Sequence, residues 1–276
     1  MFLAALATIC FATAAPLVRL APELTSAQIA FGRMLGGALL VALWARAHGQ
    51  PLAMPSRRLL AYGLVAAAHF LLYIAALRLT SIAHVLVLVN LSPVFVAVLS
   101  RPVLGETLSR SRYPGIILAL AGVAVMVGFD PMPSLQRLAG DALAMLSGLA
   151  YAGYSLAGRR ERQHYPLYAY AAGVYSAAAL ALAPAALYSP PGLRELAVSA
   201  WPLFLLALLP TAIGHTLYNA ALRRVPAVSA NLVATQEVSL GVLFGMMLLA
   251  EMPPPAAILG GLMSLAGVAL VLRGGQ

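Results

Sequence analysis

The sequence predicts an all-α integral membrane protein, in which ten transmembrane helices form two inverted five-helix repeats around a central cavity. Three observations lead to this fold class. Apolar residues make up 62% of the 276 residues and charged residues only 9%, whereas a soluble domain carries roughly 25% charged residues. The apolar residues fall into long runs that short polar loops separate. Finally, a stretch of the first half recurs in the second half at a constant separation of 145 residues.

Ten runs are long and apolar enough to cross a membrane as helices, which takes roughly 20 residues each. They lie at 2–20, 26–45, 59–77, 83–103, 112–129, 141–158, 166–188, 201–222, 229–250 and 255–273. The first run contains ATAA at 12–15, a small-residue pattern that also occurs at signal-peptide cleavage sites. Because no basic residue precedes it and nine further runs follow, we expect a first transmembrane helix and not a signal peptide.

The repeat aligns residues 73–126 with 218–271 without a gap and with thirteen identities. The run LAGVA, for example, occurs at 120–124 and again at 265–269. Other identical pairs are Tyr73 and Tyr218, Arg78 and Arg223, Glu106 and Glu251, and Gly115 and Gly260. We therefore divide the chain into a first five-helix repeat (1–129), an extracytoplasmic linker (130–140) and a second repeat (141–273).

The loop arginines predict the orientation of the helices. All 17 basic residues are arginines; twelve fall in the loops and the C-terminus on one predicted side of the membrane, and four in the loops on the other side. Short loops rich in Lys and Arg stay in the cytoplasm, so both termini are predicted to be cytoplasmic. Since each half has an odd number of helices, the second half must enter the membrane in the opposite sense. Many secondary transporters have this plan, with substrate bound near the midplane between the repeats.

Several motifs resemble those of a known family. The stretch NLSPVFVAVLSRPVLGE at 90–106 and the endings LAGVAVMVG and LAGVALVL of two spans are similar to the EamA family of the drug/metabolite transporter superfamily. The resemblance covers nearly the whole chain. It implies export of small metabolites, amino acids among them, or of toxic organic cations, and the branch that exports aromatic and other neutral amino acids is one candidate. It also implies a multi-pass protein of the bacterial inner (cytoplasmic) membrane.

The chain departs from the family pattern at two places. Members often carry a Trp-Gly pair in the first helix, where this sequence reads CFATAAP at 10–16. Members also often carry Glu-Pro early in the ninth helix, where this sequence has Gln236, Glu237 and Val238. These departures concern the substrate more than the fold.

Two ionisable residues in the second half are candidates for proton coupling. A charged group in hydrocarbon costs several kcal/mol, so it is expected to face the bundle interior or water. Glu237 shares one helix face with small residues, Gly241 and Gly245 among them, and is therefore expected to point into the protein. His215 lies at a similar depth in the preceding span. The alternative is that both side chains only stabilise helix packing.

Further polar and aromatic residues inside the spans are candidates for a substrate site. They are His69, Tyr73, Asn90, Tyr151, Tyr154, His215, Tyr218, Asn219 and Gln236, with Tyr170 and Tyr175 as additional aromatic side chains. A histidine or an aromatic residue in an apolar helix also serves in packing, which is the structural alternative for each. Pro93 is expected to kink the fourth helix.

Arg33 is the one arginine placed inside a span. Its neighbours Gly32 and Gly36 have a spacing that allows close helix approach. Arg33 is either a counter-ion for a carboxylate substrate or a side chain that reaches the outer membrane interface, and we favour the second interpretation.

Missing motifs exclude other classes of protein. There is no GxxxxGK[ST] sequence, so direct ATP drive is not expected. There is no HExxH, and Cys10 is the single cysteine, so no metal site, cofactor or catalytic residue is predicted. Without lysine, the spans also offer few cations for a phosphorylated substrate.

The sequence thus predicts a secondary transporter that exports neutral or aromatic amino acids by alternating access. The alternatives are an exporter of toxic organic cations, a membrane enzyme that uses His215 and Glu237, and a non-transporting membrane scaffold. The expected partners are a small-molecule substrate and the lipid bilayer. Nucleic acid is not expected despite the net charge of +9, because the arginines lie in short loops. We expect a monomer, with a dimer as the alternative.

Overall fold

The computed structural model describes residues 1–52, 56–104, 110–128, 134–161, 163–225 and 227–273, and all regular elements in these ranges are helical. The elements include one 3₁₀ turn, η1, and one π-helical segment, η2. Their bounds are α1 Phe2–Ala12, α2 Ala14–Arg19, α3 Ser26–Ala47, α4 Arg57–Leu79, α5 Ile82–Val89, α6 Ser92–Leu104, η1 Arg110–Arg112, α7 Tyr113–Gly128, α8 Leu135–Glu161, α9 Leu167–Leu187, α10 Leu193–Leu206, η2 Ala207–His215, α11 Thr216–Arg224, α12 Ala227–Ala234, α13 Glu237–Leu249 and α14 Pro255–Arg273.

The helices have the length and surface of membrane-spanning segments. Six segments are long and apolar enough to cross a membrane, and α13 and most of α7 and α14 are shorter apolar helices. Large apolar side chains also point outward; Ile117, Leu180 and Met247, for example, are 67%, 68% and 72% exposed. Such a surface is suited to lipid, so the chain is an integral membrane protein.

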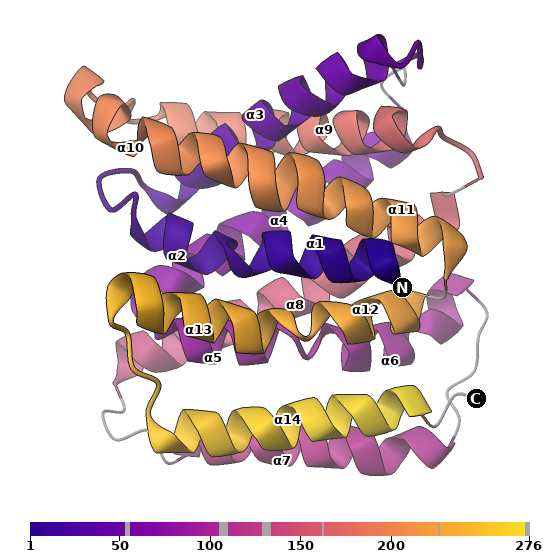
Figure 1. Cartoon of the computed structure of the whole chain (residues 1–276), viewed down its shortest axis with the longest axis vertical. Coiled ribbons are helices and arrows are strands. Elements are labelled where there is room, and N and C mark those ends of the chain that lie inside the picture. Colours follow the sequence, from indigo (N-terminus) through magenta and orange to yellow (C-terminus); the bar gives the residue numbers. More distant parts are fainter. Residues whose placement is uncertain (53–55, 105–109, 129–133, 162, 226, 274–276) are drawn as a thin grey trace.

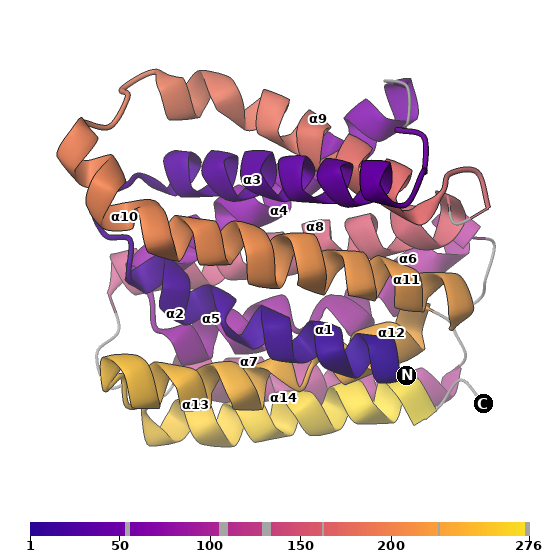
Figure 2. The ribbon, with the colours of Figure 1, turned by 45° about the horizontal axis from the view of Figure 1, so that its top comes forward.

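The helices lie side by side as one bundle (Figures 1 and 2). The start of α1 and the end of α14 lie at the same end of this bundle. The last residues of α2 and of α4 lie at the opposite end.

Helix α8 begins inside the predicted linker. The linker expected at 130–140 is helical from Leu135 onward, because α8 begins there. Ser134 accepts a hydrogen bond from the backbone N–H of Arg137 at 3.2 Å and so caps the first turn. No proline follows to stop the helix. The first residues of the linker, 130–133, and Glu106 of the repeat lie outside the described residues.

Three of the predicted spans are interrupted or distorted by proline. The proline ring clashes with the carbonyl of the residue four positions earlier. Accordingly, α1 ends at Ala12, four residues before Pro16, and α5 ends at Val89, four residues before Pro93. Pro210 lies inside η2, where the helix widens to the π form.

A fourth interruption has no proline to explain it. The span expected at 229–250 is two helices, because α12 ends at Ala234 and α13 begins at Glu237. The gap, Thr235 and Gln236, lies 145 residues after Asn90 and Leu91, which form the gap between α5 and α6.

Helices α7 and α14 pack closely along one side of the bundle (Figure 1). A Cβ atom added to Gly122 would lie 2.5 Å from the carbonyl oxygen of Gly260, and one added to Gly267 would lie 2.6 Å from the carbonyl oxygen of Gly115. The residues that meet run in opposite directions along the two helices, so the helices are antiparallel. Ser264 also donates a hydrogen bond to the carbonyl oxygen of Ala119 at 3.0 Å.

Candidate functional site

A small cavity lies where the interrupted helices meet. It measures about 30 Å³, which is the space of about one water molecule. Its lining comes from α1, α2, α3, α4, α5, α8, η2, α13 and the gap after α5: Phe11, Ala14, Arg33, His69, Phe70, Tyr73, Val89, Asn90, Tyr151, Pro210, His215 and Glu237. We call this space the central cavity. A larger solute can enter it only if the lining helices separate.

Six of the residues predicted for the substrate site or for proton coupling line the central cavity: His69, Tyr73, Asn90, Tyr151, His215 and Glu237. They come from helices far apart in the chain. The helix interruptions account for two of them, because Asn90 lies in the gap after α5 and Glu237 begins α13.

Aromatic rings form much of the cavity wall. The ring of His215 lies 4.5 Å from that of Phe11 and 5.0 Å from that of Phe70, centroid to centroid. The rings of His69 and Tyr151 are 5.0 Å apart on the adjoining wall. Such a wall suits an apolar or aromatic group of a ligand.

Tyr154, Tyr218 and Asn219 are buried but are not among the lining residues. Asn219 donates a hydrogen bond to the Tyr154 hydroxyl at 2.6 Å. The Tyr218 hydroxyl lies 2.9 Å from Ser155 Oγ and accepts a hydrogen bond from Asn231 at 2.7 Å. These contacts join α8, α11 and α12, so the three residues support the cavity wall from behind.

Gln236 lies apart from the other predicted site residues. Its side chain is exposed, and it does not line the central cavity. Consecutive helical residues point about 100° apart, so Gln236 and Glu237 cannot share one face.

The interface interpretation of Arg33 is wrong. Arg33 is only 1% exposed, lines the central cavity and donates a hydrogen bond from Nε to Thr211 Oγ1 at 3.1 Å. Its guanidinium carbon lies 4.4 Å from the centre of the Phe70 ring, a cation–π distance. The neighbouring Gly32 and Gly36 face α10 and η2, where added Cβ atoms would lie 2.8 Å from Leu203 and 2.7 Å from Ala207. The close helix approach expected from the glycine spacing is therefore present, and it buries the arginine.

Two buried polar atoms in the cavity wall have no hydrogen-bond partner among the described residues. They are Tyr73 Oη and His215 Nδ1. Buried polar groups are nearly always paired in native structures, so unpaired ones that converge on a cavity indicate a place for a ligand or water.

Sequence reasoning missed Asn231, Thr211, Phe11 and Phe70. Asn231 is 1% exposed; its amide nitrogen reaches Tyr218 in the second half, and its amide oxygen accepts a hydrogen bond from Ser92 of the first half at 3.2 Å. The sequence could have indicated Asn231, because it is a polar amide inside an apolar run. The two phenylalanines gave no signal, because an apolar residue in an apolar run looks the same whichever side it faces.

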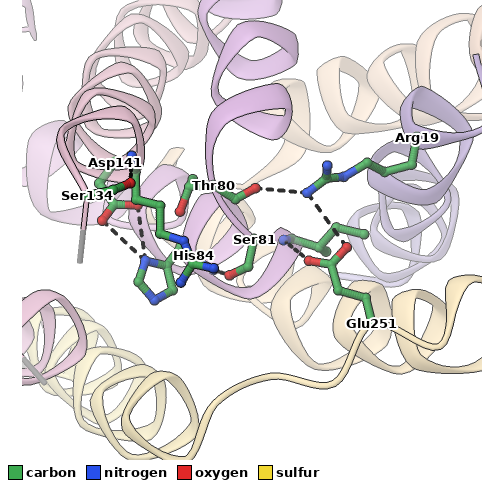
Figure 3. Close-up of polar contacts among 9 residues, drawn as sticks. Arg19, Thr80, Ser81, His84, Ser134, Asp141 and Glu251 are labelled. Atoms are coloured by element: carbon green, nitrogen blue, oxygen red, sulfur yellow. Dashed lines mark hydrogen bonds and ion pairs between the residues drawn. The ribbon is translucent and has the colours of Figure 1, made fainter. Parts of the chain in front are cut away.

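Polar side chains hold together the end of the bundle at which α2 and α4 end, which we call the Arg19 end (Figure 3). Arg19 donates a hydrogen bond to the carbonyl oxygen of Thr80 at 2.8 Å and lies 3.7 Å from the Glu251 carboxylate. Glu251 also accepts the backbone N–H of Ile82 at 2.6 Å. Ala250, with φ 53°, ends α13 in the left-handed conformation and turns the chain toward this contact. The network therefore joins α2, the α4–α5 loop and the end of α13.

A second pair and a wider cavity lie beside this network. The ring of His84 on α5 lies 3.1 Å from the Asp141 carboxylate on α8, and both side chains are buried. A cavity of about 550 Å³ at this end is lined by Arg19, Arg78, Ser81 and Glu251 among others.

The opposite end of the bundle, the Arg159 end, has related contacts. Arg159 donates to the carbonyl oxygens of Leu222 and Val225 at 3.1 and 3.2 Å, and Arg223 donates to that of Tyr165 at 2.5 Å. These bonds join α8 and the α8–α9 loop to the end of α11.

The chain matches the family described as the EamA-like transporter family over residues 1–128 and again over 138–273. The chain belongs to the EamA-like transporter family. Its members and its named relatives are transporters.

Two curated relatives are exporters in bacteria. The "Pseudopaline exporter CntI" of Pseudomonas aeruginosa (strain UCBPP-PA14) is 29% identical over 272 residues, which cover 95% of this EamA chain and 92% of the relative. The "Probable terminal-alkyne amino-acid exporter" of Streptantibioticus cattleyicolor is 31% identical over 191 residues, or 67% of this chain. That second match spans 62% of the relative's length.

A solved crystal structure has the same fold. It superposes with a TM-score of 0.75 at 18% identity, and the match covers 98% of this EamA chain and 95% of the other. At this identity, the likeness concerns the fold alone.

Proposed function

We propose that this protein is a secondary transporter that exports small metabolites, neutral or aromatic amino acids above all, by alternating access. The observation that carries the proposal is the central cavity, where the interrupted helices of an EamA member bring a buried arginine, a glutamate, unpaired polar atoms and aromatic rings together. Interrupted helices around a central site are the usual architecture of substrate sites in secondary transporters.

The proposal includes ten membrane helices in two inverted repeats, at 1–129 and 141–273. Equivalent spans pack on each other, because α3 contacts α9 and α7 contacts α14. The contact of α5 with α13 likewise recurs as the contact between their repeat counterparts, α12 and α6. Across α7 and α14, the contact of Gly122 with Gly260 recurs as the contact of Gly267 with Gly115, which is what a two-fold axis across the helices requires.

The two ends of the bundle also support inversion. Arg78 donates to the carbonyl of Leu24, in the loop before the second predicted helix, at the Arg19 end. Its repeat partner Arg223 donates to the carbonyl of Tyr165, in the loop before the seventh, at the Arg159 end. Likewise, Thr80 and Val225 are 145 residues apart and each accepts from an arginine.

Alternating access requires that each end can close. In the described conformation, the arginine–carbonyl contacts hold both ends, and the central cavity holds about one water molecule. Opening at one end needs the local network to break while the other persists. We assign the Arg159 end and both termini to the cytoplasm, on the loop arginines, and the protein to the bacterial inner membrane.

The substrate class rests on the cavity chemistry and on the relatives. One relative is named as an amino-acid exporter and another as a pseudopaline exporter. The aromatic wall suits an apolar or aromatic side chain. Export of organic cations is the second candidate, because Glu237 and aromatic rings would attract a cation. The buried Arg33 in the same cavity opposes a substrate that carries positive charge alone.

Exchange across proteoliposomes tests the proposal. Liposomes that contain the protein and unlabelled phenylalanine should take up external labelled phenylalanine faster than protein-free liposomes, and the label should be chemically unchanged by chromatography. Labelled tetraphenylphosphonium should exchange no faster than in protein-free liposomes. Converted label would favour a membrane enzyme, and the absence of exchange of any amino acid would contradict the proposal.

A further inference from the structure

We infer that Arg33 and Glu237 bind the carboxylate and the ammonium group of one zwitterionic substrate in the central cavity. This inference rests on the proposed export function, because it assigns the substrate's two charged groups to two side chains. The protein would then recognise its substrate by the presence of both charges on one small molecule. The argument uses the burial and bonding of each charge, their joint exposure to one cavity and the unpaired polar atoms beside them.

Arg33 is fixed in place but is not neutralised. Its Nε donates a hydrogen bond to Thr211, and its guanidinium carbon lies over the Phe70 ring. Within the described part of the chain, the bond to Thr211 is the hydrogen bond that the Arg33 side chain makes. Its two terminal nitrogens therefore remain available to a ligand. A guanidinium group that presents two parallel N–H donors is suited to a carboxylate. The buried arginine is therefore ready for an anionic group.

Glu237 supplies the opposite charge to the same cavity. It lies at the start of α13, next to Asn90, and both line the central cavity. Among the described residues, Arg33 and Glu237 form no ion pair within 4.0 Å. Two charges without an ionic partner in a low-dielectric site are costly, and a ligand with the complementary pair of charges would offset both costs.

The unpaired polar atoms are a second, independent indication of a ligand. Tyr73 and His215 are each 4% exposed, yet Tyr73 Oη and His215 Nδ1 have no partner in the described part of the chain. Both residues line the central cavity with the two charges. The Phe11 and Phe70 rings beside His215 would then contact the substrate's side chain.

This arrangement discriminates by charge. A molecule with an ammonium group alone would leave Arg33 unpaired, and one with a carboxylate alone would leave Glu237 unpaired. Either loss should weaken binding by about tenfold to a hundredfold, the usual effect of a hydrogen bond to a charged group. An exporter of zwitterions would thereby spare metabolites that carry a single charge.

The test compares four related ligands on the purified protein in detergent. These are phenylalanine, its amide (no carboxylate), its N-acetyl derivative (no ammonium) and phenethylamine. Affinities come from ligand-dependent thermal shifts. Wild type should bind phenylalanine at least about tenfold more tightly than the three analogues.

Each charge is then removed in turn. Arg33→Gln should weaken phenylalanine binding to the level of the amide and leave amide binding unchanged. Glu237→Gln should do the same relative to the N-acetyl derivative. Arg46→Gln, on the exposed end of the same helix α3, and Glu23→Gln, in an exposed loop, are the matched controls and should retain wild-type selectivity. Should Arg33→Gln fail to fold, Arg33→Lys keeps the charge, and it should bind phenylalanine more weakly but still prefer it to the amide.

The outcomes separate this inference from the proposed function. If wild type exchanges phenylalanine in liposomes but binds the amide equally well, or if Arg33→Gln lowers the affinity for acid and amide alike, the assignment of the two charges is wrong and the transporter proposal stands. If wild type neither binds nor exchanges any amino acid, the proposed substrate class fails as well.

Discussion

Gly122 and Gly267 lie at equivalent positions of two antiparallel helices. Each glycine packs against the helix that carries the other. Gly122 faces Gly260 and Ser264, while Gly267 faces Gly115 and Ala119. Subtracting 145 converts Gly260 to Gly115 and Ser264 to Ala119. A contact that returns to itself when the two halves are exchanged is the mark of a two-fold relation. Because the helices are antiparallel, an axis that relates them would cross them, as the proposed inverted repeat requires.

Gly122 and Gly267 should not tolerate a methyl group. Alanine at Gly122 would place Cβ 2.5 Å from the Gly260 carbonyl oxygen, and backbone atoms cannot rotate away. We expect Gly122→Ala to lower stability by about 1–3 kcal/mol, the usual cost of overpacking. This exceeds or cancels the gain of about 1 kcal/mol that alanine brings to a helix. Thermal denaturation in detergent measures the change.

Gly153→Ala is the matched control. An added Cβ at Gly153 would meet Val65 at 3.4 Å, an ordinary contact, so this variant should be as stable as wild type or slightly more stable. Equal melting temperatures for the Gly122 and Gly153 variants would contradict the packing of α7 on α14.

The two ends of α9 should lie on opposite sides of the membrane. In a Cys10→Ala background, Gln163→Cys lies in the exposed loop before α9 and Ser189→Cys in the exposed loop after it. An impermeant thiol reagent applied to whole cells should label the cysteine at 189 and spare the one at 163. The reverse pattern would overturn the orientation that the loop arginines predict.

The sequence was informative wherever a residue type conflicts with an apolar helix. Glu237, His215 and Asn90 are such residues, and all three line the central cavity. The side of the helix they face was harder to predict. The Arg33 side chain is long enough to reach the membrane interface. Its burial depends on the packing of α10 and η2 against Gly32 and Gly36. That contact joins residues about 170 positions apart in the chain, beyond the reach of local pattern reasoning.

The helix interruptions were only partly accessible from sequence. Pro93 predicts a distortion, and α5 ends four residues before it. The gap at Thr235 and Gln236 has no proline, and only its position 145 residues after Asn90 and Leu91 suggests it. Hydropathy likewise cannot reveal the role of Phe70, because its contact with Arg33 is made between α4 and α3.

Glu251 should control access to the central cavity from the Arg19 end. Its carboxylate joins Arg19 on α2 to the backbone of Ile82, so Glu251→Ala removes a tie between the two halves. The reporter is Ala14→Cys in the central cavity, in a Cys10→Ala background. An impermeant thiol reagent should label this reporter several-fold faster when Glu251→Ala is also present. Glu23→Ala, in an exposed loop at the same end, is the control and should leave the labelling rate of the reporter unchanged. An unchanged rate for Glu251→Ala would mean that the network does not close this end.

Glu237 should couple transport to protons. It is the carboxylate that lines the central cavity, and the equivalent position of the first half is Ser92, so coupling would involve one half only. Glu237→Gln keeps the size and hydrogen bonding of the side chain but cannot bind and release a proton. The variant should still exchange substrate across liposomes, at the higher concentrations that its weaker binding requires, yet fail to accumulate it when a pH gradient is imposed.

His215→Asn separates the two candidates for proton coupling. If His215 contributes polar contact alone, this variant should weaken exchange and keep whatever gradient-driven accumulation remains. Accumulation that persists in Glu237→Gln but disappears in His215→Asn would move the coupling role to the histidine. Wild-type transport that is indifferent to the gradient would make the protein a facilitator.

Substrate protection of the cavity is the most direct test that this EamA member moves its substrate through the central cavity. The Ala14→Cys reporter in the Cys10→Ala background is reconstituted, and both thiol labelling and phenylalanine exchange are measured on the same liposomes. The cavity holds about one water molecule when closed, so a label attached at position 14 should block any solute. We predict that phenylalanine slows the labelling in proportion to its occupancy and that the labelled protein no longer exchanges phenylalanine. Labelled protein that exchanges phenylalanine at the unlabelled rate, with no protection by substrate, would contradict the account.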